Sequence, residues 1–350
     1  MRFAILRRNR SGPQRCGPVL FVATAAHTSY HANIMASEFE LIRQHFTRDG
    51  RHTDLGVGDD AALFTPTAGM QLVVSTDMLV EGTHFLPDTD PRDLGWKTLA
   101  VNVSDIAAMG ATPRWSLLAL AMPAPDEAWV EGFARGLFEC AQAFDIDLVG
   151  GDTTRGPRTL CVTIFGEVPA GHAITRGGAA PGDEVWVTGA PGRAALGLAH
   201  LQGRLRLTDA GAAECVAALQ RPQPRVAAGR ALRDVASAML DVSDGIAGDL
   251  GHILERSGVG AEIQVAALPL DALIAFGADD AAARAACLSG GDDYELLFTA
   301  PAAQRAAIER IATTQDLAIT RIGRIDDTPG LRVVDADGNV GTAGGYDHFS

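Results

Sequence analysis

Residues 94–121 read LGWKTLAVNVSDIAAMGATPRWSLLALA, and this stretch decides the fold class. Its first part carries apolar residues at helical spacing and predicts a helix over 94–109, which Met109-Gly110 ends. Its last part, 115–121, is an apolar run of strand length. A buried helix followed directly by a buried strand is typical of mixed α/β proteins.

The same alternation continues on both sides of this stretch. A segment rich in Gly, Ala and Pro, Gly171–Asp183, interrupts it and predicts a domain boundary. We expect strands at 71–75, 147–149, 160–168, 184–188, 239–242, near 262, at 294–299, near 319 and near 331, and helices at 126–143, up to about 235 and from 245. The fold class is therefore mixed α/β in two domains.

Composition narrows the classes of function. The chain has 350 residues, enough for two domains, and a hydrophobic fraction of 47% that can form ordinary cores. Its 29 basic and 43 acidic residues give a net charge of −14, which argues against nucleic acid as a partner and suits a protein that gathers cations. Lys97 is the only lysine, and it lies outside any GxxxxGK[ST] motif, so the sequence has no such phosphate loop.

Residues 1–34 differ from the rest of the chain, since they are basic and contain no acidic residue. The short apolar run Val19–Ala23 resembles that of a signal peptide, but it is too short to span a membrane. Alternatively, the start codon is misassigned and the working protein begins at Met35. We favour the second interpretation, because Ser37 and the residues after it are typical of a helix start. Residues 1–34 are thus expected to lie outside the fold.

Five cysteines are scattered along the chain and never form a CxxC pair. This pattern predicts neither a disulfide framework nor a zinc site. Reduced thiols indicate a cytoplasmic protein, with no membrane partner expected.

Acidic residues gather in six glycine-flanked or strand-end loops instead of on helix faces. Any one of these aspartates, such as Asp152, Asp244 or Asp292, could simply cap a turn or a helix. Six such loops with a single lysine favour divalent cations, because Mg²⁺ takes oxygen ligands from carboxylates and from phosphates. The sequence therefore predicts a Mg²⁺-nucleotide site without a phosphate loop. The six segments are GVGDDA (56–61), VVSTD (73–77), NVSD (102–105), VGGDTT (149–154), LDVSDG (240–245) and SGGDD (289–293).

These segments belong to a longer ordered series that resembles the thiamine-monophosphate kinase family. The resemblance runs from about Met35 to the C-terminus and leaves out the first 34 residues. The series comprises GVGDDAAL (56–63), STDMLVEGTHF (75–85), KTLAVNVSDIAAMGA (97–111), GGDTTRG (150–156), TRGGAAPGD (175–183), RPQPR (221–225), LDVSDGIAGDLGHI (240–253), SGGDDYELLF (289–298) and GYDHF (345–349).

The resemblance implies a fold, an assembly and a reaction. The fold is that of the ATP-binding superfamily of aminoimidazole ribonucleotide synthetase, with an N-terminal ATP- and Mg²⁺-binding domain (35–170) and a C-terminal domain (171–350). The assembly is a homodimer paired through N-terminal strands. The reaction is phosphorylation of thiamine monophosphate to thiamine diphosphate by direct in-line transfer from ATP, assisted by several Mg²⁺ ions.

The resemblance also implies roles for residues that match the family's motifs. Asp292 stands where glutamate is common, and its shorter side chain could reach the substrate through water. His84 could instead be an ordinary surface histidine, and Tyr346 could simply pack. The implied Mg²⁺ ligands are Asp60, Ser75, Thr76, Asp77, Asp105, Asp152, Asp241 and Asp244; the nucleotide contacts are Gly151, Asp152, Arg176 and Ser243; the thiamine monophosphate contacts are His84, Asp292 and Tyr346.

Two other functions stay open at this point. Another Mg²⁺-ATP enzyme of the same superfamily would share the fold, although the N-terminal domain lacks the early Cys and nearby Lys of a selenophosphate synthetase. A non-catalytic metal or nucleotide sensor would keep the acidic loops. The presence of the acceptor-side residues His84, Asp292 and Tyr346 argues against a sensor.

Overall fold

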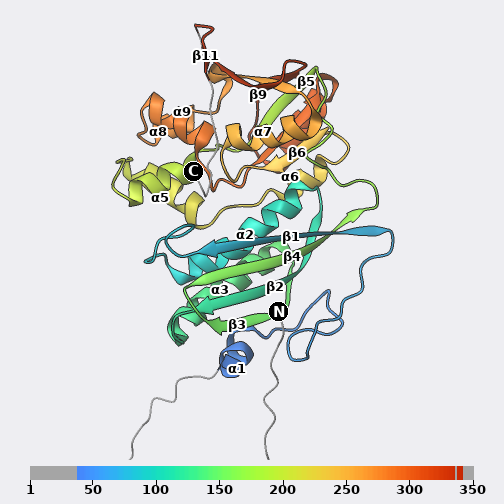
Figure 1. The fold of residues 1–350 in the computed structure, drawn as a ribbon, viewed down its shortest axis with the longest axis vertical. Coiled ribbons are helices and arrows are strands. Elements are labelled where there is room, and N and C mark those ends of the chain that lie inside the picture. Colours follow the sequence, from blue (N-terminus) through green and yellow to red (C-terminus); the bar gives the residue numbers. More distant parts are fainter. Residues whose placement is uncertain (1–37, 336, 342–350) are drawn as a thin grey trace, which may run out of the picture. The chain divides into compact units, whose positions relative to one another are not determined.

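The computed structural model describes residues 38–335 and 337–341, and these form a four-stranded and a seven-stranded sheet with helices packed on them (Figure 1). The expected mixed α/β class is confirmed. Residues 1–34, Cys16 and Tyr346 lie outside the described residues, so the predictions about them stay predictions. Within the described part of the chain, no helix is both long and apolar enough to cross a bilayer.

The first sheet has the order β1-β4-β2-β3, with β1 (Met70–Val80), β2 (Thr112–Met122), β3 (Asp147–Arg155) and β4 (Thr159–Pro169). Helices α2 (Pro91–Ala108) and α3 (Glu127–Phe144) pack on each other, and α2 packs on the strands (Figure 1). Asp90 and Asp126 accept backbone N–H groups at the two helix starts, as N-cap residues do. One buried apolar cluster fills the space between these elements.

Strand β1 differs from the expectation that a strand ends at residues 75–77. It continues to Val80, because residues 76–80 stay in antiparallel register with 159–163 of β4. Side chains of a strand alternate between its faces. Ser75 and Asp77 therefore share the face that looks toward α2, and Thr76 lies on the opposite face.

The second sheet has the order β11-β10-β7-β9-β5-β8-β6. The strand expected at 294–299 begins two residues later, since Tyr294 has a φ of 53°, in the left-handed region. The strands are β5 (Asp183–Thr188), β6 (Ala238–Asp241), β7 (Gly260–Gln264), β8 (Leu296–Pro301), β9 (Ile319–Asp326), β10 (Gly330–Val334) and β11 (Val340–Gly341). The helices are α4 (Arg193–Leu201), α5 (Asp209–Gln220), α6 (Val226–Ala231), α7 (Ile246–Ser257), α8 (Asp271–Ala275), α9 (Asp280–Ser289) and α10 (Arg305–Gln315).

Helix α2 connects the two sheets. It is buried on nearly every side, as expected of a helix that is apolar all round. Its last residues, Ala107 and Ala108, pack in a cluster with Trp186, Met239 and Phe298 of the second sheet. The helix therefore carries its polar residues to the place where the two sheets meet.

The RPQPR segment (221–225) fastens the same region. Arg221 forms ion pairs with Asp93 of α2 and Glu139 of α3. Arg225 binds the buried carboxylate of Glu295 through two hydrogen bonds of 2.7 and 2.6 Å. This motif of the sequence thus has a structural role, which joins helices of the first sheet to the second.

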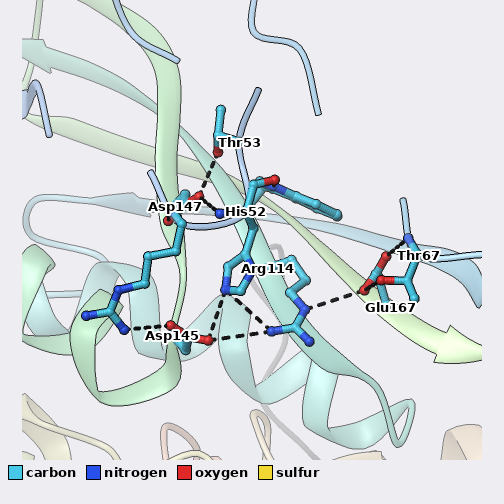
Figure 2. Close-up of polar contacts among 9 residues, drawn as sticks. His52, Thr53, Thr67, Arg114, Asp145, Asp147 and Glu167 are labelled. Atoms are coloured by element: carbon cyan, nitrogen blue, oxygen red, sulfur yellow. Dashed lines mark hydrogen bonds and ion pairs between the residues drawn. The ribbon is translucent and has the colours of Figure 1, made fainter. Parts of the chain in front are cut away.

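An irregular segment precedes β1 and carries the GVGDDAAL motif. It follows the short helices α1 (Glu38–Leu41) and Ile42–Phe46. Figure 2 shows how its two ends are fixed: the Asp147 carboxylate accepts hydrogen bonds from residues 51–53, and Glu167 accepts two from Thr67 at 2.5 and 2.9 Å. Paired backbone hydrogen bonds between Leu55 and Leu63 close the loop that contains Asp60.

Candidate functional site

Three predicted metal ligands lie near one another where the sheets meet, and we call Asp77, Asp105 and Asp241 the carboxylate cluster. Asp77 comes from β1, Asp105 from α2 and Asp241 from the end of β6. The Ser75 hydroxyl donates a 2.5 Å hydrogen bond to Asp105. The Asp77 backbone N–H donates to the side-chain oxygen of Asn102 at 3.0 Å, which holds β1 against α2.

Burial and mutual repulsion raise the pKa values of this cluster. Burial, and then the charge of Asp105, raise the pKa of Asp77 to about 7. Burial raises the pKa of Asp241 well above its usual range, and the charges of Asp105 and Asp77 act in the same direction. Burial also raises the pKa of Asp105, although the Ser75 hydrogen bond and the charge of Arg176 oppose this. A nearby cation would stabilise the ionised form of carboxylates whose pKa values are raised in this way.

The cluster fits the chemistry of a hard divalent cation, since all of its donors are oxygens. Among residues 38–335 and 337–341, no three His, Cys, Asp or Glu side chains are arranged to hold a metal ion by themselves. Mg²⁺ does not need such a cage, because it commonly binds through one or two carboxylates together with substrate phosphates. The donor set therefore suits a metal that arrives with a nucleotide.

The loop that contains Ser243 and Asp244 lies beside the cluster, between β6 and α7. The Asp249 carboxylate, in the first turn of α7, accepts the backbone N–H groups of both residues at 3.0 Å. Burial raises the pKa of Asp249 to about 7. Sequence reasoning missed Asp249, although an acidic residue in a first helical turn just after a Ser-Asp pair is a usable signal.

The predicted acceptor residues His84 and Asp292 both contact Lys97, a residue to which the sequence analysis assigns no role. The Lys97 ammonium lies 3.1 Å from a carboxylate oxygen of Asp292 and 3.5 Å from the backbone oxygen of His84. The Tyr294 hydroxyl donates to the other Asp292 oxygen at 3.0 Å. We call these four residues the lysine cluster.

The two clusters adjoin each other. The backbone N–H of Asp292 donates to the carbonyl oxygen of Ser243 at 2.9 Å. Burial raises the pKa of Tyr294 above its usual range, and nearby charges that include Asp292 and Asp77 add to this effect. Residues predicted for the metal, nucleotide and acceptor thus lie around one region.

Other predicted residues are not brought to this region. Asp77 of β1 and Gly151 of β3 belong to the same row of paired residues across the sheet, but β4 and β2 lie between them. At ~4.8 Å per strand, they are about 14 Å apart. Asp152 belongs to the neighbouring row, which contains Met78, so its side chain is on the face opposite that of Asp77. Thr76 shares that outer face and bonds to the Val162 carbonyl oxygen. Asp60 is exposed on its loop.

Arg176 lies at the edge of the site. Its charge lowers the pKa values of Asp105 and Asp249, against the larger effect of their burial. With His252, Glu255 and Arg256 it lines a cavity of about 530 Å³. The two arginines in this lining suit the cavity to an anionic ligand.

Comparison with family models identifies both parts of the chain. Residues 58–168 match the model described as AIR synthase related protein, N-terminal domain. Residues 180–336 match the corresponding C-terminal domain. The expected aminoimidazole ribonucleotide synthetase-like architecture is thereby confirmed.

The chain is also similar over most of its length to curated proteins and to solved structures. A thiamine-monophosphate kinase of Salmonella typhimurium is 47% identical over 320 residues, which span 89% of this chain and 98% of that protein. The crystal structure of thiamine-monophosphate kinase from Stenotrophomonas maltophilia has a TM-score of 0.77 and 47% identity, covering 86% of this chain and 95% of that one. AaThiL complexed with AMPPCP and TMP has a TM-score of 0.72 and 32% identity, covering 84% and 92%.

Proposed function

The chain belongs to the thiamine-monophosphate kinase family, and from this premise we propose that it transfers the γ-phosphoryl group of ATP directly to thiamine monophosphate. The observation that carries this proposal is that Asp77 of β1 and Asp105 of α2 lie near Asp241 of β6, and that the loop after β6 accepts the backbone N–H of Asp292. A complex of one relative, AaThiL with AMPPCP and TMP, supports both substrates.

The proposed reaction is in-line and needs no nucleophile on the protein. A phosphate oxygen of thiamine monophosphate is already ionised at neutral pH, so no general base is required. Its bond to the γ-phosphorus forms as the bond between that phosphorus and the β,γ-bridging oxygen breaks, which releases ADP. The chain's task is to hold two anionic phosphates in line and to exclude competing geometries.

We propose Asp77, Asp105, Asp241 and Asp244 as the residues that hold Mg²⁺, with Ser75 orienting Asp105. Mg²⁺ held there would supply positive charge that offsets the phosphate charges, which a chain with a net charge of −14 supplies poorly by itself. Arg176 and Ser243 would contact the nucleotide, while His84 and Asp292 would contact thiamine monophosphate. Asp60, Thr76, Gly151 and Asp152 stay predictions from the resemblance. Gly151 and the side chains of Thr76 and Asp152 lie away from the carboxylate cluster, and Asp60 is exposed on its loop.

We further propose that the enzyme is cytoplasmic and acts as a homodimer. The outer face of β1 supports the second point: Met70, Leu72, Val74 and Met78 are 39–55% exposed, and we call them the β1 strip. β1 is also an edge strand of its sheet. An apolar strip on an edge strand is a surface that a second copy can cover.

Release of ADP tests the proposed function. The full chain is incubated with ATP and Mg²⁺ together with thiamine monophosphate or, separately, with thiamine. We expect turnover with the monophosphate alone. Turnover with neither would favour a non-catalytic nucleotide-binding protein. Recovery of covalent phosphoprotein after incubation with γ-labelled ATP would overturn direct transfer.

A further inference from the structure

Lys97 is the only lysine of the chain, and its side chain is just 3% exposed. Apart from Lys97, every Lys or Arg residue of the chain is an arginine. The planar guanidinium of arginine presents five hydrogen-bond donors. At Lys97 the charged group faces two oxygens, one of Asp292 and one of the His84 backbone. A compact ammonium satisfies such a pair where a guanidinium would leave buried donors without partners. The geometry thus explains a lysine at this one position.

Tyr294 reaches the same carboxylate from another direction. It follows the SGGDD segment in the chain, yet its ring packs in the core of the first sheet. Its backbone and that of Asp292 have φ values of 53° and 68°, in the left-handed region. Side chains other than glycine rarely adopt this conformation, and it persists where surrounding contacts fix it. In this conformation the Tyr294 hydroxyl reaches the Asp292 carboxylate.

Both carboxylate oxygens of Asp292 are consequently held, one by Lys97 and one by Tyr294. The Asp292 side chain itself remains 29% exposed, whereas the two groups that hold it are buried. A carboxylate oxygen has two lone pairs, so each oxygen can still accept from the open side. An exposed aspartate on a loop would normally rotate freely, but this one has a fixed position and orientation.

We propose that Lys97 and Tyr294 are positioning residues for the acceptor: they hold the Asp292 carboxylate in the orientation that receives the thiazolium cation of thiamine monophosphate. The inference rests on the proposed function, since it takes Asp292 to be on the acceptor side. The Lys97 charge offsets that of Asp292, so the pair attracts a cation less than a lone carboxylate would. Its contribution is preorganisation, which lowers the cost of ordering the site when substrate binds.

A purely structural contact would behave differently. If Lys97 and Tyr294 only fasten the 290–295 loop to the first sheet, their removal lowers thermal stability and affects both substrates alike. If they position Asp292, their removal affects thiamine monophosphate selectively. The ratio of the two KM values therefore separates the explanations.

The test uses the full chain with Tyr294→Phe, which keeps the buried ring and removes the hydroxyl. We expect the KM for thiamine monophosphate to rise about tenfold, since a hydrogen bond to a charged group is lost. The KM for ATP and kcat should stay within about twofold. Lys97→Arg, which keeps the charge but not the geometry, should act in the same direction. Ser116→Ala is the matched control, because it removes another buried hydroxyl, on β2, that donates to the Asp147 backbone oxygen at 3.4 Å.

Two results would overturn the positioning role. One is a KM for thiamine monophosphate within twofold of wild type in both Tyr294→Phe and Lys97→Arg. The other is an equal rise of both KM values. If wild-type protein itself fails to phosphorylate thiamine monophosphate, the proposed function fails first. If wild type is active and the variants match it, only the positioning role fails.

Discussion

The Ser75 hydroxyl on β1 donates a 2.5 Å hydrogen bond to the Asp105 carboxylate on α2. The bond joins two motifs that are 30 residues apart in the chain. It also sets the direction in which Asp105 faces, toward Asp77 and Asp241. The arrangement of the carboxylate cluster thus depends on the contacts between this strand and this helix.

Removing one charge of the cluster should abolish activity without unfolding the protein. Asp77→Asn and Asp105→Asn each keep the side-chain size and remove a charged ligand. We expect large losses of kcat and a shift of the Mg²⁺ dependence to higher concentration. Thermal stability without metal at pH 8 should hold or rise, because burial and repulsion already raise the pKa of Asp77 to about 7.

Activity titrated against Mg²⁺ and a thermal melt measure these two effects. Asp271→Asn, an exposed aspartate in the first turn of α8, is the control and should match wild type in both. Full activity of either cluster variant at low Mg²⁺ would contradict the ligand assignment.

The β1 strip should hold two copies together. Val74→Lys places a charge in the middle of this surface, where Val74 is 55% exposed. We expect light scattering after gel filtration to show a dimer for wild type and a shift to monomer for the variant. Leu201→Lys on α4, where the leucine is 42% exposed, is the matched control and should leave the dimer intact. A dimer that persists in Val74→Lys would show that the interface lies elsewhere. A monomeric wild type would contradict the proposed dimer.

Titration of Asp293 should contribute to the pH dependence of the protein's stability. Its carboxylate accepts the backbone N–H groups of Gly192 and Ala194 at the start of α4. Burial raises its pKa from 3.8 to about 8, against the effect of these hydrogen bonds. The folded state then binds the proton more tightly than the unfolded state. The resulting stability is present below pH 3.8 and is lost as the pH rises through about 8.

Asp293→Asn removes this titration and keeps one oxygen for the α4 N–H groups. We expect wild type to lose stability relative to the variant between pH 5 and 8.5, as measured by thermal melts of both proteins. Comparing the two proteins at each pH cancels the contributions of the other titrating groups, which include Glu295 and Arg193, whose charges act on Asp293. A difference in melting temperature that is constant over this range would show that Asp293 does not titrate there.

Local patterns were enough to predict most elements, because apolar periodicity and turn residues act over a few residues. The expected helix over 94–109 corresponds to α2, which begins three residues earlier and ends one residue earlier, and the expected strand at 184–188 corresponds to β5, which begins one residue earlier. The end of β1 was missed, since its continuation to Val80 depends on pairing with β4. Thr76 and Asp77 are adjacent in sequence, but that pairing puts them on opposite faces.

The site was predicted as a set of motifs and not as a geometry. Lys97 and Asp292 are 195 residues apart, and nothing in one sequence links them. The same holds for Asp77 and Gly151, which lie at opposite edges of one sheet. The resemblance supplied residue types and order, while the strand register and the burial of α2 decide which of those residues can meet.

Replacing Asp292, the partner of Lys97, should affect both thermal stability and substrate binding, and the two effects can be separated. Asp292→Asn keeps the left-handed backbone that asparagine tolerates and removes the charge. It leaves the Lys97 ammonium buried without its carboxylate, so the variant should melt at a lower temperature. It should also raise the KM for thiamine monophosphate about tenfold, equivalent to about 1.4 kcal/mol, with little change in the KM for ATP.

The double variant Lys97→Met, Asp292→Asn distinguishes the two effects. Methionine fills most of the lysine's space without a charge, so the double variant should regain most of the lost melting temperature. The KM for thiamine monophosphate should stay high, because the carboxylate that faces the thiazolium is still absent. Recovery of that KM together with stability would show that Asp292 serves the fold alone, and a change confined to the KM for ATP would move Asp292 to the nucleotide side of the site.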